Sequence, residues 1–221
     1  MAPSSRSTEF HGRPGGIRWR LAADGVFVES SGIERTTGAP TTVTRAWETY
    51  AASINRWAAQ YDVYCELILA TMCTETTANP AARRNEPGWT SDSATPGKVS
   101  LGLMQTLIST ARAVLRDPTI DAAWLLVPDN SIRAGTAYIA HQRESTELDP
   151  PLVACAYNAG GVYDNDGAKN RWKLRQFPLG TGEHCDRFVK WFNDAVAVLK
   201  EHPTRPVRSF ATFLGGGTPP A

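Results

Sequence analysis

Apolar residues recur along most of this chain at the spacing of α-helices, and that periodicity is the strongest constraint on its fold. From residue 43 they fall three, four or seven positions apart, at Val43, Trp47, Tyr50, Ile54, Trp57 and Tyr61. Such spacing gives a helix one apolar face, which must be buried against other elements. The pattern predicts further helices from Asp62, as N-cap, to Pro80 and over residues 103–115, 130–139, 151–158 and 183–200. The sequence therefore predicts a mostly α-helical fold.

Both ends of the chain lack this helical pattern. Residues 1–16 are rich in Ser, Pro, Gly and Arg and predict a flexible arm. Alternating apolar residues over 17–29, around an Asp24-Gly25 turn, predict a small β-hairpin. A chain of 221 residues can bury one substantial core. We therefore expect three parts: an N-terminal arm and hairpin over 1–42, one helical domain over 43–201 and a loosely packed tail over 202–221.

Composition argues against several classes of protein. The formal net charge is +1, which gives no preference for a nucleic acid partner. No apolar stretch is long enough to span a membrane, and the N-terminus lacks the apolar segment of an export signal. The four His and four Cys residues lack metal-ligand spacing, and no nucleotide-binding motif is present, so we expect no metal and no cofactor. The cysteines are expected to be buried free thiols, with a Cys73–Cys155 disulfide as the alternative.

Glu75 occupies a position where the helical pattern predicts an apolar residue. It follows Ile68 by seven positions and Thr71 by four, on the face that should be buried. Burial without a cation disfavours the charged form, and so does the negative end of the helix dipole, so the pKa of Glu75 should be raised. A raised pKa suits a general acid. The alternative is a structural role near the surface or in an ion pair with Arg83 or Arg84.

Three short segments place this acid in a wider pattern: CTETTANP at 73–80, SLGLMQTL at 100–107 and ACAYNAGG at 154–161. In order and chemistry they resemble the lytic transglycosylase family and, more distantly, goose-type lysozymes. In that family a catalytic Glu ends a helix, a Gly-Leu-Met-Gln turn opens the next helix, and an Ala-Tyr-Asn-Ala-Gly turn closes a later one. The resemblance covers about residues 44–200, including NSIRAGTAYI at 130–139 and, more loosely, GEHCDRFV at 182–189. It implies a lysozyme-like helical domain.

The resemblance also implies a role for each matching residue. Glu75 would be the catalytic acid, and Thr76 stands where the family commonly has Ser. Gln105 offers a donor and an acceptor for N-acetyl or hydroxyl groups, and Met104 offers an apolar surface for a sugar. Glycines at 102 and 160 suit turns in which the backbone approaches a ligand or takes a positive φ. The implied substrate-binding residues are Thr76, Ser100, Gly102, Leu103, Met104, Gln105, Tyr157, Asn158, Ala159 and Gly160.

The implied reaction cleaves the β-1,4 bond between N-acetylmuramic acid and N-acetylglucosamine in the glycan strands of peptidoglycan. Most glycosidases use two carboxyl groups for such a cleavage. In a lytic transglycosylase one carboxyl group is sufficient for the cleavage, so Glu75 would act first as an acid and then as a base. The product would be a 1,6-anhydro sugar, and no water would be consumed.

Other functions stay open on the sequence. If Asp92, in the long polar loop 79–101, lay about 6.5–9.5 Å from Glu75, the pair could activate water, as in an inverting muramidase or chitinase-type hydrolase. Otherwise Asp92 is a turn residue. The fold could also serve a non-catalytic wall-binding subunit of a phage tail or injection device. Because an enzyme of the cell wall acts on its periplasmic or extracellular face, the missing export signal predicts release by lysis, as for an endolysin, or carriage by a phage particle or secretion apparatus.

Overall fold

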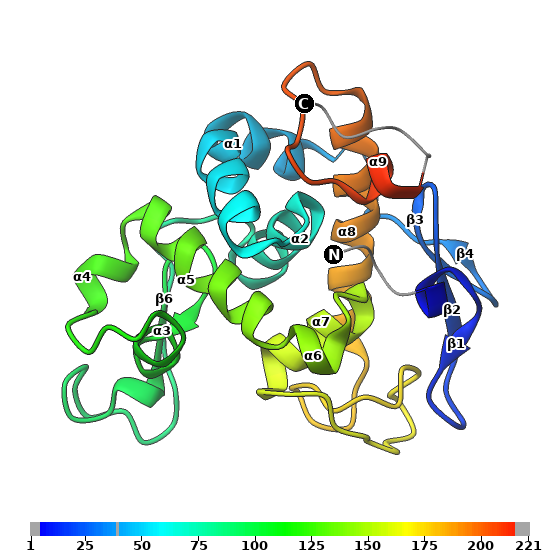
Figure 1. Ribbon diagram of the computed structural model, residues 1–221. Coiled ribbons are helices and arrows are strands. Elements are labelled where there is room, and N and C mark those ends of the chain that lie inside the picture. Colours follow the sequence, from blue (N-terminus) through cyan, green and yellow to red (C-terminus); the bar gives the residue numbers. More distant parts are fainter. Residues whose placement is uncertain (1–4, 39, 215–221) are drawn as a thin grey trace.

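Helices dominate the computed structural model, which describes residues 5–38 and 40–214 (Figure 1). The central helix, α2, contacts four other helices around it. All nine residues from Cys65 to Cys73 are buried, which is the pattern of a helix enclosed on every side. The mostly α-helical class predicted from the sequence is confirmed. These five helices are α1 (Thr41–Tyr61), α2 (Cys65–Thr76), α5 (Pro128–His141), α7 (Pro150–Ala159) and α8 (Glu183–Glu201).

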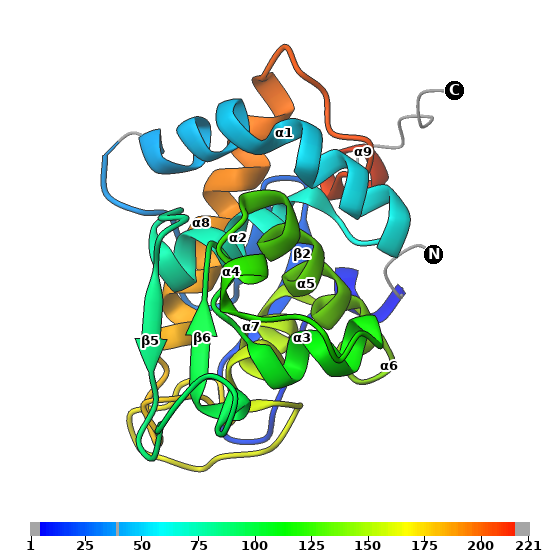
Figure 2. The same ribbon diagram turned by 90° about the vertical axis from the view of Figure 1, so that its left-hand side faces the viewer.

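Residues 79–127 form a smaller unit beside α5, in which a short sheet packs on small helices (Figure 2). Its antiparallel strands are ordered β5-β6-β7. The first two strands and the loop between them, residues 83–101, are called the β5–β6 arm below. An apolar cluster of its own, which includes Val99, Leu101 and Ile108, supports this unit. Its elements are β5 (Arg83–Asn85), η2 (Pro96–Lys98), β6 (Val99–Leu101), β7 (Thr106–Leu107), α3 (Ile108–Leu115) and α4 (Ala122–Leu125).

An N-terminal antiparallel sheet covers one side of α8 (Figure 1). Trp19, Leu21, Val26 and Val28 form its buried face, because side chains alternate between the two faces of a strand. The predicted hairpin is confirmed, with the turn at residues 23–24, since Ala22 pairs with Gly25. The strands, in the order β1-β2-β3-β4, are β1 (His11–Gly12), β2 (Arg18–Ala22), β3 (Gly25–Val28) and β4 (Gly32–Ile33).

Several predicted helix boundaries are wrong. Asp62 does not cap the start of α2: it ends α1 in a left-handed conformation, and α2 begins after an extended Tyr64. Likewise α2 ends at Thr76, ahead of Pro80, because Thr77 takes a positive φ of 54°. The helix expected over 103–115 begins only at Ile108, since the residues before it form a turn and strand β7. The polar loop 79–101 contributes two strands to a sheet that the sequence did not predict.

Both ends of the chain are more ordered than predicted. Residues 5–16 contain η1 (Ser5–Thr8) and β1, and the ring of His11 binds the buried Asp149 at 2.9 Å. The tail is not loosely packed as far as residue 214. Phe210 in α9 (Phe210–Leu214) is 1% exposed, and its ring stacks on Tyr64 with centroids 3.9 Å apart. Residues 1–4 and 215–221, which complete the predicted arm and tail, lie outside the described residues.

The cysteine prediction is confirmed. Cys65, Cys73, Cys155 and Cys185 are all buried free thiols, so the alternative Cys73–Cys155 disulfide is not formed. Within residues 5–38 and 40–214, none of the helices combines the length and the apolar composition that crossing a bilayer requires. Over the same residues, His, Cys, Asp and Glu side chains do not gather in threes that could hold a metal ion.

Candidate active site

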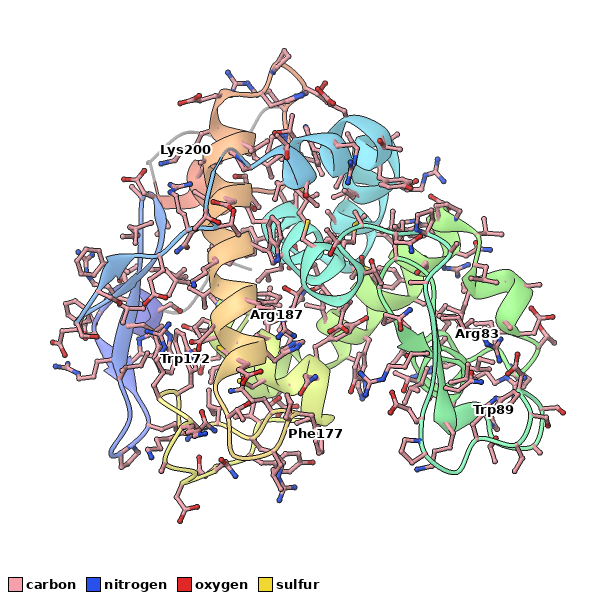
Figure 3. The ribbon with its side chains drawn as sticks, turned by 180° about the vertical axis from the view of Figure 1, so that it is seen from behind. Arg83, Trp89, Trp172, Phe177, Arg187 and Lys200 are labelled. Carbon is pink, nitrogen blue, oxygen red and sulfur yellow. The ribbon has the colours of Figure 1, made fainter. Side chains whose placement is uncertain are left out.

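A cavity of about 380 Å³ opens where the C-terminal end of α2 meets the β5–β6 arm and α7. Its volume is in the range of small-ligand sites. Figure 3 shows Phe177 and Arg187 on one side of the molecule and the arm that carries Arg83 and Trp89 on the other. The lining residues are Glu75, Arg84, Glu86, Ser100, Gln105, Leu107, Tyr157, Asn158 and Phe177.

Glu75, in the last turn of α2, presents a carboxyl group that is largely buried at the cavity wall. Its side chain is 19% exposed. Burial raises the pKa of Glu75 from 4.5 to about 7, although the positive charges of Arg187 and Arg84 act in the opposite direction. The alternative ion pairs with Arg83 or Arg84 are not formed, because Arg83 binds Asp92 and Arg84 binds Glu86 at 3.1 Å. Near neutral pH this carboxyl group is therefore poised to give up a proton and to take one back.

His184 is a polar neighbour of this carboxyl group. It lies in the first turn of α8, is 4% exposed, and places Nε2 3.7 Å from Oε1 of Glu75. Burial and then the charge of Arg187 lower the pKa of His184 to about 3, against a backbone hydrogen bond with Ala154 that raises it. The imidazole is therefore neutral near pH 7, and the contact with Glu75 is not a salt bridge.

Tyr157 closes the cavity on the α7 side. Its hydroxyl group donates to the carbonyl of Met104 at 2.8 Å and lies 3.1 Å from Oγ1 of Thr106. Burial raises the pKa of Tyr157 well above 10, and the charge of Glu75 adds to this rise. The phenol therefore stays protonated and ties the turn at residues 102–106 to α7. Next to it, Asn158 accepts the backbone N–H of Phe177 with its side-chain oxygen.

The turn at residues 102–105 is held by its own polar groups. Gly102 has a φ of 71°, and a Cβ there would lie 2.3 Å from the carbonyl oxygen of Leu125, so only glycine fits. Gln105 has a φ of 47°; its amide donates to the carbonyls of Ala82 and Gly102, each at 3.1 Å, and accepts from Ser100 at 3.0 Å. Gln105 thus lines the cavity while its amide group bonds within the protein.

The structure brings together only part of the predicted site. Glu75, Ser100, Gln105, Tyr157 and Asn158 line one cavity. Leu103 and Met104 are completely buried, and Thr76 donates to the carbonyl of Leu103 at 2.9 Å, so these three support the turn from behind. Gly102 braces the same turn, while Ala159 and Gly160 form the end of α7 without lining the cavity.

Other cavity residues were not predicted. Arg84 and Glu86 come from the β5–β6 arm, whose first strand lacks an apolar pattern, and Phe177 comes from an irregular loop. His184 is in the GEHCDRFV segment, whose resemblance to a family element was the one available signal.

Asp92 does not line this cavity. Successive side chains of β5 point to opposite faces, so Arg84 faces the cavity while Arg83 faces away from it. Asp92 binds Arg83 through two hydrogen bonds of 2.6 and 3.0 Å and accepts the indole N–H of Trp89 at 3.0 Å. These contacts give Asp92 a structural role in the arm, and its role as a second carboxyl group stays a prediction.

Comparison with known proteins identifies the family. The model of the transglycosylase SLT domain matches residues 52–177, which hold Glu75 and most of the cavity. The chain belongs to the transglycosylase SLT domain family. A search of curated protein sequences finds no significant match.

Solved structures support the same fold. An inactive Glu-to-Gln mutant of the lytic transglycosylase Slt from Pseudomonas aeruginosa is 20% identical, with a TM-score of 0.51 over 73% of this SLT chain and 26% of the other. A 70-kDa soluble lytic transglycosylase in complex with bulgecin A is 20% identical, with a TM-score of 0.50 over 77% of this chain and 27% of the other. The chain thus spans about a quarter of each relative's length. The lysozyme-like helical domain expected from the sequence is confirmed.

Proposed function

We propose that this SLT domain is a peptidoglycan lytic transglycosylase in which Glu75 is the single catalytic carboxyl group. The observation that carries the proposal is a largely buried carboxyl group with a pKa near 7, at the wall of a cavity large enough for sugar residues. Family membership supports the same reading, because the matched region contains Glu75 and the motif residues around it. The substrate is the glycan strand of peptidoglycan, whose scissile bond joins N-acetylmuramic acid to N-acetylglucosamine.

The proposed reaction uses both protonation states of Glu75. The neutral acid protonates the glycosidic oxygen as the bond to the anomeric carbon breaks, which leaves an oxocarbenium-like centre on the muramic sugar. The resulting carboxylate then removes the proton of the 6-hydroxyl group of that sugar. The hydroxyl oxygen bonds to the anomeric carbon and closes the 1,6-anhydro ring. Glu75 ends the cycle protonated, and no water is consumed.

The contacts of the other carboxyl groups favour this reaction over hydrolysis. An inverting hydrolase needs a second carboxylate that can hold a water molecule. Glu86 lines the cavity, but Arg84 pairs with it at 3.1 Å, and Asp92 is bound by Arg83 on the other face of the strand. The hydrogen bonds from Arg83 lower the pKa of Asp92, which makes its carboxylate a weaker base.

Mass spectrometry of the soluble products tests the proposal directly. Purified peptidoglycan incubated with the protein should release fragments that end in 1,6-anhydro-N-acetylmuramic acid. Fragments with reducing ends alone would instead identify a hydrolase.

The variant Glu75→Gln keeps the shape of the side chain but has no transferable proton, so it should reduce fragment release by at least about a hundredfold. The matched control is Glu144→Gln, which changes an exposed carboxyl group on α6 (Arg143–Thr146), away from the cavity. Undiminished release by Glu75→Gln would exclude Glu75 as the catalyst. Binding without release by the unmodified protein would favour a wall-binding subunit. Delivery by lysis, a phage particle or a secretion apparatus stays a prediction.

A further inference from the structure

His184 belongs to no predicted motif role, yet it is the polar side chain that faces the carboxyl group of Glu75. Its Nε2 atom lies 3.7 Å from Oε1, and its side chain is only 5% exposed. That separation is longer than a hydrogen bond, but catalytic hydrogen bonds are often long in the absence of substrate. A neutral, buried imidazole beside the acid therefore needs only a small movement to bond with it.

Asn158 determines which nitrogen of this imidazole carries the proton. The side-chain oxygen of Asn158 already accepts the backbone N–H of Phe177, so its amide nitrogen faces His184. That amide donates toward Nδ1, 3.4 Å away, which favours the tautomer with Nδ1 as the acceptor and the proton on Nε2. The N–H group of Nε2 is then directed at Glu75.

We propose that His184 is a positioning residue for Glu75: it holds the carboxyl group in place and donates the Nε2 proton in a hydrogen bond to the carboxylate that forms during the reaction. The inference rests on the proposed function. Ionisation of Glu75 draws the N–H group toward Oε1 and closes the gap to hydrogen-bond distance. The carboxylate is thereby stabilised at the moment when it must act as a base, and His184 itself stays neutral.

Charged and titratable groups from every neighbouring element act on the same carboxyl group. Arg187 on α8 and Arg84 on β5 both lower the pKa of Glu75, and Tyr157 on α7 stays protonated beside it. None of these three donates a hydrogen bond to Glu75 within the described residues. His184 differs from them because it is neutral, buried and already in contact.

The test measures the pKa of Glu75 itself. In protein carrying ¹³C-labelled Glu, the side-chain carboxyl signal of Glu75 is assigned by its loss in Glu75→Gln and is followed from pH 4 to 9. His184→Met removes the ring donor, so the pKa should rise by about one unit, as expected when a charged group loses a hydrogen bond. His184→Gln carries an amide N–H in place of Nε2 and should restore the original pKa. His141→Gln, an exposed His on α5, is the matched control.

Cleavage of peptidoglycan supplies the second readout. His184→Met should lower the maximal rate about tenfold to a hundredfold with little change in KM, while His184→Gln should stay within about threefold of the unmodified protein. Unchanged values for both the pKa and the rate in a folded His184→Met protein would overturn the inference. A protein that releases no anhydro product would refute the proposed function instead, and the titration would still report on His184.

Discussion

Replacing Glu75 with Gln should stabilise the protein at alkaline pH, because the carboxyl group of Glu75 is held where its charge is unfavourable. In the folded protein burial raises the pKa of Glu75 to about 7, whereas the unfolded chain has the ordinary value of 4.5. A carboxyl group with a raised pKa binds its proton more tightly in the folded state. Stability therefore falls as the pH rises from about 4.5 to about 7, and the full loss persists above pH 7.

The size of this effect follows from the difference between the two pKa values. Each unit corresponds to about 1.4 kcal/mol, so a rise from 4.5 to about 7 corresponds to about 3 kcal/mol at pH 8.5. Because 19% of the side chain remains exposed, water can solvate part of the charge, and we expect a gain of about 1–3 kcal/mol for Glu75→Gln. Near pH 4 the gain should vanish, because both states then carry mostly neutral carboxyl groups.

Urea unfolding at pH 4 and pH 8.5 measures this difference. The unmodified protein, Glu75→Gln and the exposed control Glu144→Gln are compared at both pH values. Glu66 is also completely buried with a pKa raised to about 7, but its contribution is common to all three proteins and cancels. If Glu75→Gln were no more stable than Glu144→Gln at pH 8.5, the carboxyl group of Glu75 would be well solvated, and the argument for its acid role would fail.

Three further substitutions test the packing of Met104, the C-terminal segment and the role of Asp92. In Gly135→Ala the new Cβ would lie 2.6 Å from Met104, so urea unfolding should show a loss of about 1–3 kcal/mol. Phe210→Ala should cost about 3–5 kcal/mol in the same assay, against less than about 1 for the half-exposed Val207→Ala; equal costs would show that the C-terminal segment is not part of the core. Asp92→Asn should leave anhydro product as the main species in mass spectrometry. A loss of activity of a hundredfold or more would instead support a hydrolase in which Asp92 is the second carboxyl group.

The sequence predicted the helices whose apolar residues follow a helical period. α1 and α8 begin and end within two residues of their predicted limits, since a long amphipathic face specifies a helix locally. The apolar periodicity did not predict where α3 begins, because the residues before α3 form a turn in which Gln105 takes a φ of 47°. No local preference predicts that conformation for Gln; it is stabilised by amide bonds to Ala82 and Gly102, which depend on the folded structure.

For a related reason, the sequence did not predict the order of the chain ends or the strands of the β5–β6 arm. The strand Arg83–Asn85 has no apolar alternation, and it forms because Arg84 pairs with Ser100 across the arm. The C-terminal segment offers one buried aromatic, Phe210, whose partners Tyr64 and Phe192 are far away in the sequence. Periodicity within a short window cannot report contacts of this kind.

In the candidate site, several motif residues support the wall of the cavity, whereas some other residues that line the cavity are outside the motifs. Thr76, Gln105 and Tyr157 donate hydrogen bonds to backbone carbonyls within residues 102–104, which ties the turn at 102–106 to α2 and α7. The motifs therefore specify the shape of the wall around Glu75 more than direct contacts with a sugar.

Three residues that line the cavity are outside the motifs. The ring of Phe177 is 54% exposed, and the paired side chains of Arg84 and Glu86 come from the β5–β6 arm. Under the proposed function, variation in these outer residues should change which glycan strands are cleaved, while substitution of Glu75 or of the turn that supports it should reduce cleavage itself.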